Sequence, residues 1–137
     1  MLRLHAGATL IMLGVILVIQ VVHYPLFRGV GSERFPEYEA AHTSRITWIV
    51  LPTMLIELGT AGLLLLAPLG PAQRGLAWVG LALVAVIWAS TGLIQVPLHG
   101  RLSKGFDPEA HGRLVASNWV RTVAWSARGV LALLLVR

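Results

Sequence analysis

Four long apolar runs separated by polar segments dominate the chain. They cover about residues 4–22, 46–67, 76–98 and 114–136, and a helix needs roughly 20 mostly apolar residues to cross a bilayer. The runs are too continuously apolar for barrel strands, and lipid admits only helices or closed barrels as spanning structures. The pattern therefore predicts an all-α fold, an integral membrane four-helix bundle that forms one transmembrane domain over residues 1–137.

The polar segments between the runs differ in length. Residues 68–75 form a short turn rich in proline and glycine, whereas residues 24–45 and 99–113 are predicted to be longer, charged loops. With four spans, both long loops lie on one side of the membrane, and the termini and the short turn lie on the other. Six basic residues lie on the long-loop side and three on the other side, which favours cytoplasmic long loops and external termini in a membrane of the bacterial inner type.

Composition narrows the class of protein further. The chain is 56% hydrophobic and 12% charged, against roughly 25% charged residues in a soluble domain. These values exclude a disordered chain, a coiled coil and an ordinary soluble enzyme. The absence of cysteine excludes disulfides, thiolate metal ligands and cysteine nucleophiles. The net charge of +5 comes mostly from flanking and loop arginines, so we assign it to membrane topology and expect no nucleic-acid partner.

A shift of 76 residues superimposes several polar positions of the two halves. His23 falls on His99, His42 on Asn118, and Arg45 on Arg121. This register predicts two tandem helix hairpins, about residues 1–67 and 76–137, related by a pseudo-two-fold axis along the membrane normal.

Near such an axis His23, His42, His99 and Asn118 would converge close to one membrane face. Neutral imidazole suits iron, copper and zinc, and two facing histidines can ligate haem. We therefore predict a transition metal or haem held by the three histidines, with Asn118 as fourth ligand or hydrogen-bond donor. The alternative is that these residues cap helix ends and form hydrogen bonds at the membrane interface.

Two glutamines precede the histidines by about one helical turn. Gln20 shares a face with His23, and Gln95 shares one with His99, so each glutamine is expected either to orient its histidine or to bridge two helices.

Charged residues inside the spans mark function or a buried pair. Glu57 and Arg128 lie roughly 16 and 20 Å into their spans from the same side, which predicts an ion pair between them. The pair would fix helix register, relay protons or form the floor of an anion site. Arg121 is expected to bind an anionic group of a substrate or cofactor. Arg45 is expected to do the same or to anchor the chain at the membrane boundary.

The faces of the second and fourth spans are expected to meet across a cavity. Asn118, Arg121, Trp125 and Arg128 form one stripe, and His42 and Glu57 lie on the corresponding face of the second span.

Other polar and aromatic residues receive simpler interpretations. Tyr24, Phe27, Trp48 and Trp119 are expected in an interfacial aromatic belt. His5 and His111 are expected at the surface. Glu39 is interpreted as a loop charge, with a role beside His42 as the alternative.

The second half reads Gln95-Val-Pro-Leu-His99-Gly-Arg-Leu102 and then Asn118-Trp-Val-Arg121-Thr122. Over about 45 residues it resembles the anthrone-oxygenase-like family of small four-span membrane proteins. His99 stands where that family tends to carry asparagine. The resemblance implies an oxidase or oxygenase that acts on a flat, lipophilic aromatic or quinone-like substrate.

The leading hypothesis is thus a membrane-embedded oxidoreductase with its site between the two hairpins. Its partners would be the lipid bilayer and a lipophilic small molecule, and homo-oligomerisation is left open. One alternative is a small transporter or channel with an intramembrane Glu/Arg site. The first and third spans are nearly featureless before Gln20 and Gln95, which predicts a blind pocket instead of a path. The other alternative is a structural subunit whose polar residues are all mutually satisfied.

Overall fold

The computed structural model describes residues 1–137 as four long helical rods without a strand. The first rod contains α1 (Leu2–Val18), a π-helical turn (Ile19–His23), α2 (Tyr24–Leu26) and a 3-10 turn (Phe27–Gly29). The second is α3 (Phe35–Leu66). The third contains α4 (Pro71–Ser90), a second π-helical turn (Thr91–Gln95) and α5 (Val96–Leu102), and the fourth is α6 (Pro108–Val136). All four rods are long and apolar enough to cross a membrane, so the predicted four-helix bundle is confirmed.

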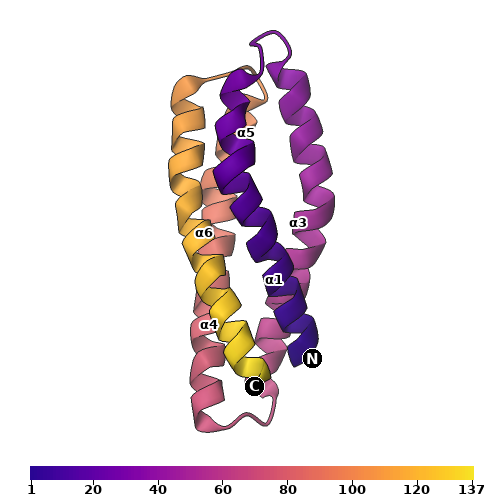
Figure 1. Cartoon of the computed structure of the whole chain (residues 1–137), viewed down its shortest axis with the longest axis vertical. Coiled ribbons are helices and arrows are strands. Elements are labelled where there is room, and N and C mark those ends of the chain that lie inside the picture. The colour runs from indigo at the N-terminus through magenta and orange to yellow at the C-terminus, as the bar shows by residue number, and fades with distance from the viewer.

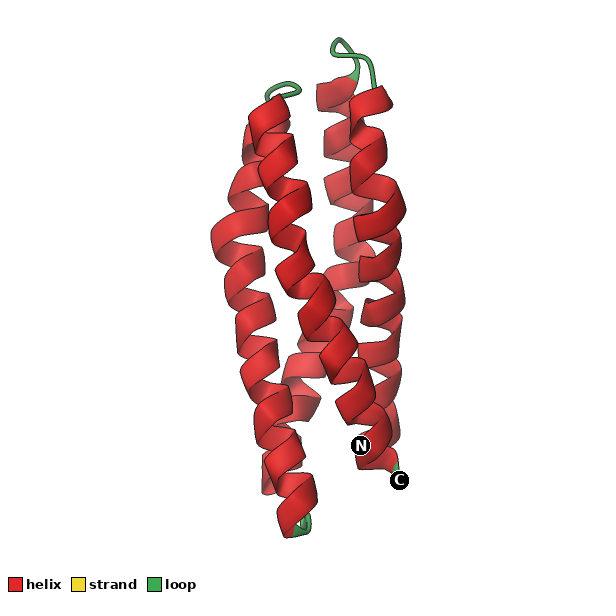
Figure 2. Cartoon of the chain, turned by 60° about the vertical axis from the view of Figure 1, so that its left-hand side comes forward, coloured by secondary structure: helices red, strands yellow, loops and turns green.

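The rods form a four-sided bundle. The α1 rod packs between α3 and α6, and the α4 rod packs between the same two helices on the opposite side (Figure 1). Both termini and the turn between α3 and α4 lie at one end, here called the terminal end, and the other two connections lie at the opposite end, here called the loop end (Figure 2). In this arrangement α3 and α6 face each other diagonally across the interior.

The two connections at the loop end are much shorter than the sequence predicts. Helix continues through most of residues 24–45 and 99–113, and only the short stretches near residues 30–34 and 103–107 are non-helical. The prediction of long loops was wrong because polar residues such as Glu39 and His42 face inward on helices that extend past the apolar runs. A rod of 32 residues is roughly 48 Å long, which exceeds a hydrocarbon core of roughly 30 Å.

Two π-helical turns widen the first and third rods. Pro25 and Pro97 have no N–H and exclude the usual bond to the carbonyl four residues earlier. The wide turns fit that constraint, because Tyr24 and Val96 donate instead to the carbonyls of Ile19 and Thr91. Pro97 follows Pro25 by 72 residues, and the second π-helical turn begins 72 residues after the first. These structural features therefore do not follow the predicted shift of 76 residues. A rotation axis between the hairpins stays a prediction.

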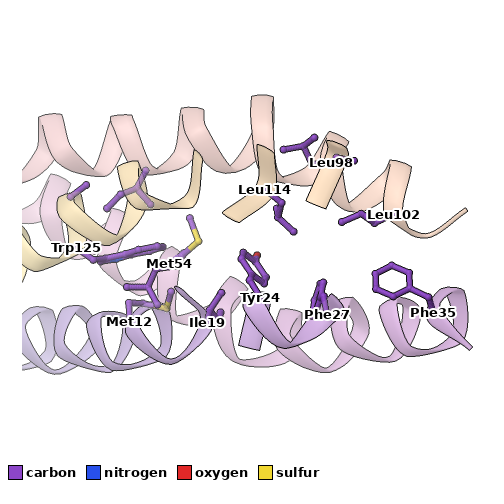
Figure 3. Close-up of a cluster of buried hydrophobic side chains, with 14 residues drawn as sticks. Met12, Ile19, Tyr24, Phe27, Phe35, Met54, Leu98, Leu102, Leu114 and Trp125 are labelled. Atoms are coloured by element: carbon purple, nitrogen blue, oxygen red, sulfur yellow. The ribbon is translucent and has the colours of Figure 1, made fainter. Parts of the chain in front are cut away.

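Apolar side chains fill the bundle along its length. Figure 3 shows this cluster from Met12, Met54 and Trp125 to Phe27 and Phe35 at the loop end. Outside the bundle, large apolar side chains remain exposed, among them Leu66 at 82% and Leu93 at 78%. Without a bilayer these faces would lie in water, and their exposure is what contact with lipid requires.

The predicted ion pair between Glu57 and Arg128 is confirmed. Arg128 Nη2 donates to Glu57 Oε1 at 2.9 Å, and Trp125 Nε1 donates to the other carboxylate oxygen at 2.9 Å. Arg128 also donates to the Gly80 carbonyl at 2.7 Å and to Thr9 Oγ1 at 3.2 Å. These contacts join all four rods around one buried charge pair.

Asp107 caps the N-terminus of α6, and its removal should weaken the loop end. The backbone N–H of Ala110, the Arg101 guanidinium and the Glu109 N–H hold the pKa of this carboxylate below its usual value. A depressed pKa contributes stability above the unfolded value of about 3.9, and this is lost as pH falls through the folded value. We expect Asp107→Ala to lower Tm at pH 7 and to match the wild type at pH 2. Asp107→Asn, which keeps the capping oxygen, should lose less. Equal Tm values for Asp107→Ala and the wild type at pH 7 would contradict this assignment.

The Glu57–Arg128 pair should be costly to break from one side. Glu57→Leu leaves the Arg128 cation buried without its counter-ion, and the expected loss is about 3–5 kcal/mol of unfolding free energy. The double variant Glu57→Leu/Arg128→Met should recover much of this loss, because no charge then remains buried. Denaturant unfolding in detergent measures both values, with the exposed Glu33→Gln as control. A single variant as stable as the control would show that Arg128 finds another partner.

Candidate functional site

Three histidines, a tyrosine and a glutamate meet at the loop end. His23 Nε2 lies 2.7 Å from His42 Nδ1, and Tyr24 Oη lies 2.9 Å from His99 Nε2. His99 Nδ1 is bonded to Glu39 Oε1. The rings of His42 and His99 are 5.6 Å apart, centroid to centroid, whereas Asn118, which was expected beside them, is hydrogen-bonded to Gln20.

The contacts of His99 define its proton positions. A carboxylate only accepts, so Nδ1 donates to Glu39, and Nε2 of the neutral ring accepts from the Tyr24 hydroxyl. Glu39 is fully buried, and its second oxygen has no hydrogen-bond partner. The order Glu39–His99–Tyr24 is thus a chain in which a proton can move from the tyrosine to the imidazole while the carboxylate stabilises the resulting cation.

The wide turns bring these residues together. His23 ends the first π-helical turn and Tyr24 follows it, whereas Gln95 ends the second turn and His99 lies one helical turn further on. Such turns are common at functional sites because they turn following side chains away from the regular helical face. Glu39 and His42 come from the first two turns of α3, which the sequence analysis placed in a loop.

The donor set does not form the predicted three-histidine metal site as arranged. His23 and His42 direct their ring nitrogens at each other, and both nitrogens of His99 are engaged with Glu39 and Tyr24. No group of three or more His, Cys, Asp or Glu side chains is arranged to hold a metal ion. A metal or haem at these histidines stays a prediction that elemental analysis tests.

Asn118 and the two glutamines bridge helices and do not contact the histidines. Asn118 Nδ2 donates to Gln20 Oε1 at 2.8 Å, and Gln20 Nε2 donates to the Val115 carbonyl at 3.2 Å. Gln95 donates to Ser117 Oγ at 3.2 Å and accepts from Ser90. Their expected roles beside the histidines were therefore wrong, and the interhelical alternative for the glutamines is confirmed. Gln95 and His99 line the same cavity, but the hydrogen bonds of the glutamine go to serine hydroxyls.

Arg121 lies buried near these groups without a counter-ion. Its side chain belongs to a residue only 5% exposed, and the three ion pairs of the molecule do not include it. Nη1 donates to Asn118 Oδ1 at 3.2 Å, the guanidinium carbon lies 5.1 Å from the centroid of the Trp125 ring, and Nε has no partner. An uncompensated buried cation is costly, so this arginine marks a place for an anionic or strongly polar ligand group.

A cavity of about 390 Å³ connects Arg121 with the histidine cluster. Tyr24, His42, His99 and Arg121 all line it, together with hydroxyl and amide side chains at Thr43, Thr47, Thr91, Gln95 and Ser103. The α3 and α6 faces meet across a cavity only at this end, because Glu57 contacts Trp125 and Arg128 directly further along. A pocket with an apolar wall and a few convergent polar groups is the usual form of a small-molecule site.

A second cavity of about 570 Å³ opens between the α1 rod and α3. Its lining is mostly apolar, with His23 and His42 at one end. Arg45 lines this cavity and is exposed; it does not reach the Arg121 pocket. This position fits the expected anchor role of Arg45 better than a contact with the same ligand group as Arg121.

Several residues of the site were misread from sequence. Glu39 was interpreted as a loop charge and Tyr24 as an interfacial ring, yet both are buried in the proton chain. His111 was expected at the surface, but it is buried and Nε2 donates to the Tyr24 carbonyl at 2.7 Å. His5, also expected at the surface, bonds Thr60 Oγ1 at 2.8 Å. The helical spacing of Glu39 and His42 was the one signal that could have identified the glutamate.

Comparison with known proteins finds no matching family model, no similar curated protein and no similar solved structure.

Proposed function

We propose that this protein is a membrane-embedded oxidoreductase that acts on a lipophilic aromatic or quinone-like substrate in the Arg121 cavity. The observation that carries the proposal is the buried Arg121 guanidinium, which lacks a counter-ion and faces the same cavity as Tyr24 and His99. The cation can hold a developing oxyanion, and the Glu39–His99–Tyr24 chain can move a proton.

The arrangement suits a substrate with an acidic CH₂ group beside an aromatic ketone. The substrate carbonyl oxygen would lie against Arg121. The Tyr24 oxygen takes a proton from the CH₂ group as its own hydroxyl proton moves to His99 Nε2, and the Glu39 carboxylate stabilises the imidazolium. The resulting enolate carries its charge on the oxygen that faces Arg121.

The oxidant in this proposal is molecular oxygen. The electron-rich carbon of the enolate transfers electrons to O₂ and forms a C–O bond. The remaining hydrogen of that carbon then leaves as a proton, the O–O bond breaks and the carbon becomes C=O. The second oxygen atom leaves as water with this proton and the one held on His99. Low dielectric strengthens the Arg121 contact with the enolate oxygen. The sequence resemblance to the anthrone-oxygenase-like family supports this reaction class.

Transport is the second candidate, and the polar contacts toward the terminal end favour it. Beyond Glu57 and Arg128 they continue through Thr9 and reach His5 with Thr60, so the first rod is less featureless than the sequence suggests. Against proton transport, Trp125 and Arg128 act only as hydrogen-bond donors in these contacts, so neither can accept a proton from a neighbour. A purely structural subunit is less well supported. Its buried polar groups should all have partners, yet Glu39, Arg121 and Arg128 each keep one atom without a hydrogen bond, and two cavities border the histidines.

We also infer that the loop end faces the cytoplasm. By their place in the sequence, six basic residues lie toward the loop end and three toward the terminal end: Arg28, Arg34, Arg45, Arg101, Lys104 and Arg113 against Arg3, Arg74 and Arg137. Basic residues accumulate on the cytoplasmic side of membrane proteins, which supports this orientation.

The enzymatic proposal predicts oxygen-dependent formation of a quinone. Protein in lipid nanodiscs should convert a tricyclic aromatic ketone with an acidic CH₂ group, such as anthrone, to its quinone with uptake of one O₂ per product. We expect Arg121→Gln to lower kcat by about 10²–10³-fold and Tyr24→Phe by about 10²–10⁴-fold. Visible absorbance measures quinone formation, and an oxygen electrode measures O₂ uptake.

Arg113→Gln is the matched control, because Arg113 is an exposed arginine on the same helix. It should leave the rate unchanged. Quinone formation that is equal in wild type, Arg121→Gln and protein-free nanodiscs would overturn the proposal.

The absence of native cysteine allows a clean test of orientation. Single cysteines at Ser32 and Ala72, both exposed, mark the loop end and the turn between α3 and α4. In intact bacterial cells a membrane-impermeant maleimide should label Ala72→Cys and spare Ser32→Cys, and both should react after lysis. The reverse pattern would place the loop end outside.

A further inference from the structure

The two cavities share one wall. Ile19, His42 and Ile46 line both the Arg121 cavity and the apolar cavity between the α1 rod and α3. A ligand in the first cavity is therefore separated from the second only by these side chains, of which His42 is the polar member.

The apolar cavity opens toward the membrane at hydrocarbon depth. Gly14, Val18 and Ile49 line it, lie within the apolar runs and are exposed on the outside of the bundle. The ribbons of the α1 rod and α3 diverge toward the loop end (Figure 1), and residues of both elements line the cavity. The cavity is thus a groove with one end at the acyl chains of the bilayer and the other at His42.

We infer that the substrate is an amphiphile with a hydrocarbon chain, and that its chain lies in the groove between the α1 rod and α3 while its oxygenated ring lies against Arg121. The inference rests on the proposed function and narrows its substrate class to an aromatic ketone with an acidic CH₂ group and an alkyl or isoprenoid tail; the quinone product carries the same tail. The inference is based on the different residues that line the two cavities. Glycine and aliphatic side chains line the groove, whereas Arg121, Tyr24 and His99 line the inner cavity. The wall that separates the two cavities is apolar at Ile19 and Ile46, so the chain would pass between these side chains once they move aside.

Gly14 gives a direct test of the groove. A Cβ at Gly14 meets nothing within 4 Å, so Gly14→Leu is tolerated by the backbone and places a side chain in the groove. Gly7→Leu is the matched control, because Gly7 lies on the same helix, is equally free around its Cβ and is outside both cavities.

The probes are 1,4-naphthoquinone and its 2-decyl derivative. Their Kd values are measured by isothermal titration calorimetry in nanodiscs of one lipid composition, so partition of the tail into lipid is the same for every variant. We expect Gly14→Leu to raise the Kd of the decyl probe at least tenfold and to leave that of the tail-less probe unchanged. Gly7→Leu should bind both probes as the wild type does, and Arg121→Gln should weaken both.

The outcomes separate the inference from the proposed function. If Gly14→Leu binds the decyl probe as tightly as the wild type while Arg121→Gln weakens both probes, the groove does not hold the chain and the ring site stands. If Gly14→Leu weakens the decyl probe but Arg121→Gln weakens neither, the groove holds the chain and the proposed function at Arg121 fails. Equal loss of both probes in Gly14→Leu overturns the division into ring and chain sites.

Discussion

The need to satisfy charge inside an apolar bundle organises this structure. Lipid-facing surfaces offer no hydrogen bonds, so each polar side chain that enters the bundle must find its partner within the protein, on its own helix or on another rod. Glu57 and Arg128 meet this need with contacts that reach all four rods, and Gln20 with Asn118 does so between the first and fourth. Because these partners are directional, they restrict the rotation of each helix more tightly than aliphatic side chains alone would.

Arg121 is the exception to that pattern, because it is a buried cation without a counter-ion. Arg128 lies two helical turns further along the same face and is neutralised by a carboxylate, whereas Arg121 has an amide, an aromatic face and a cavity. The two arginines share a helix and a similar burial, so burial alone does not explain the difference. A cation that is kept without a counter-ion beside a polar cavity is better explained by a ligand than by stability.

The fold followed from the sequence because its determinants are local. Four apolar runs, one short turn and the stripe from Asn118 to Arg128 predicted the bundle, the inward face of the fourth helix and the Glu57–Arg128 pair. The site followed only in part. The π-helical turns at Ile19 and Thr91 have no clear sequence signal apart from the prolines that follow, and they change which residues face inward. The partners of Gln20 and Gln95 lie on the fourth helix, which the spacing along a single span does not show. Hydropathy placed Glu39 and His42 in a loop although they lie on helix.

Each wide turn also acts as an angular offset within its rod. A π-helical turn holds one residue more than the helix around it, and one residue corresponds to about 100° of rotation and 1.5 Å of rise. Everything from Tyr24 onward in the first rod, and from Val96 onward in the third, is therefore turned by that amount relative to the helix before it. In the first and third rods, the helix before the wide turn is therefore rotated so that its inward side chains pack around Arg128. The helix after the turn is rotated so that its inward side chains reach the histidine cluster. Insertion or deletion of a single residue within either turn would leave the packing around Arg128 intact and turn the side chains of the histidine cluster away from one another.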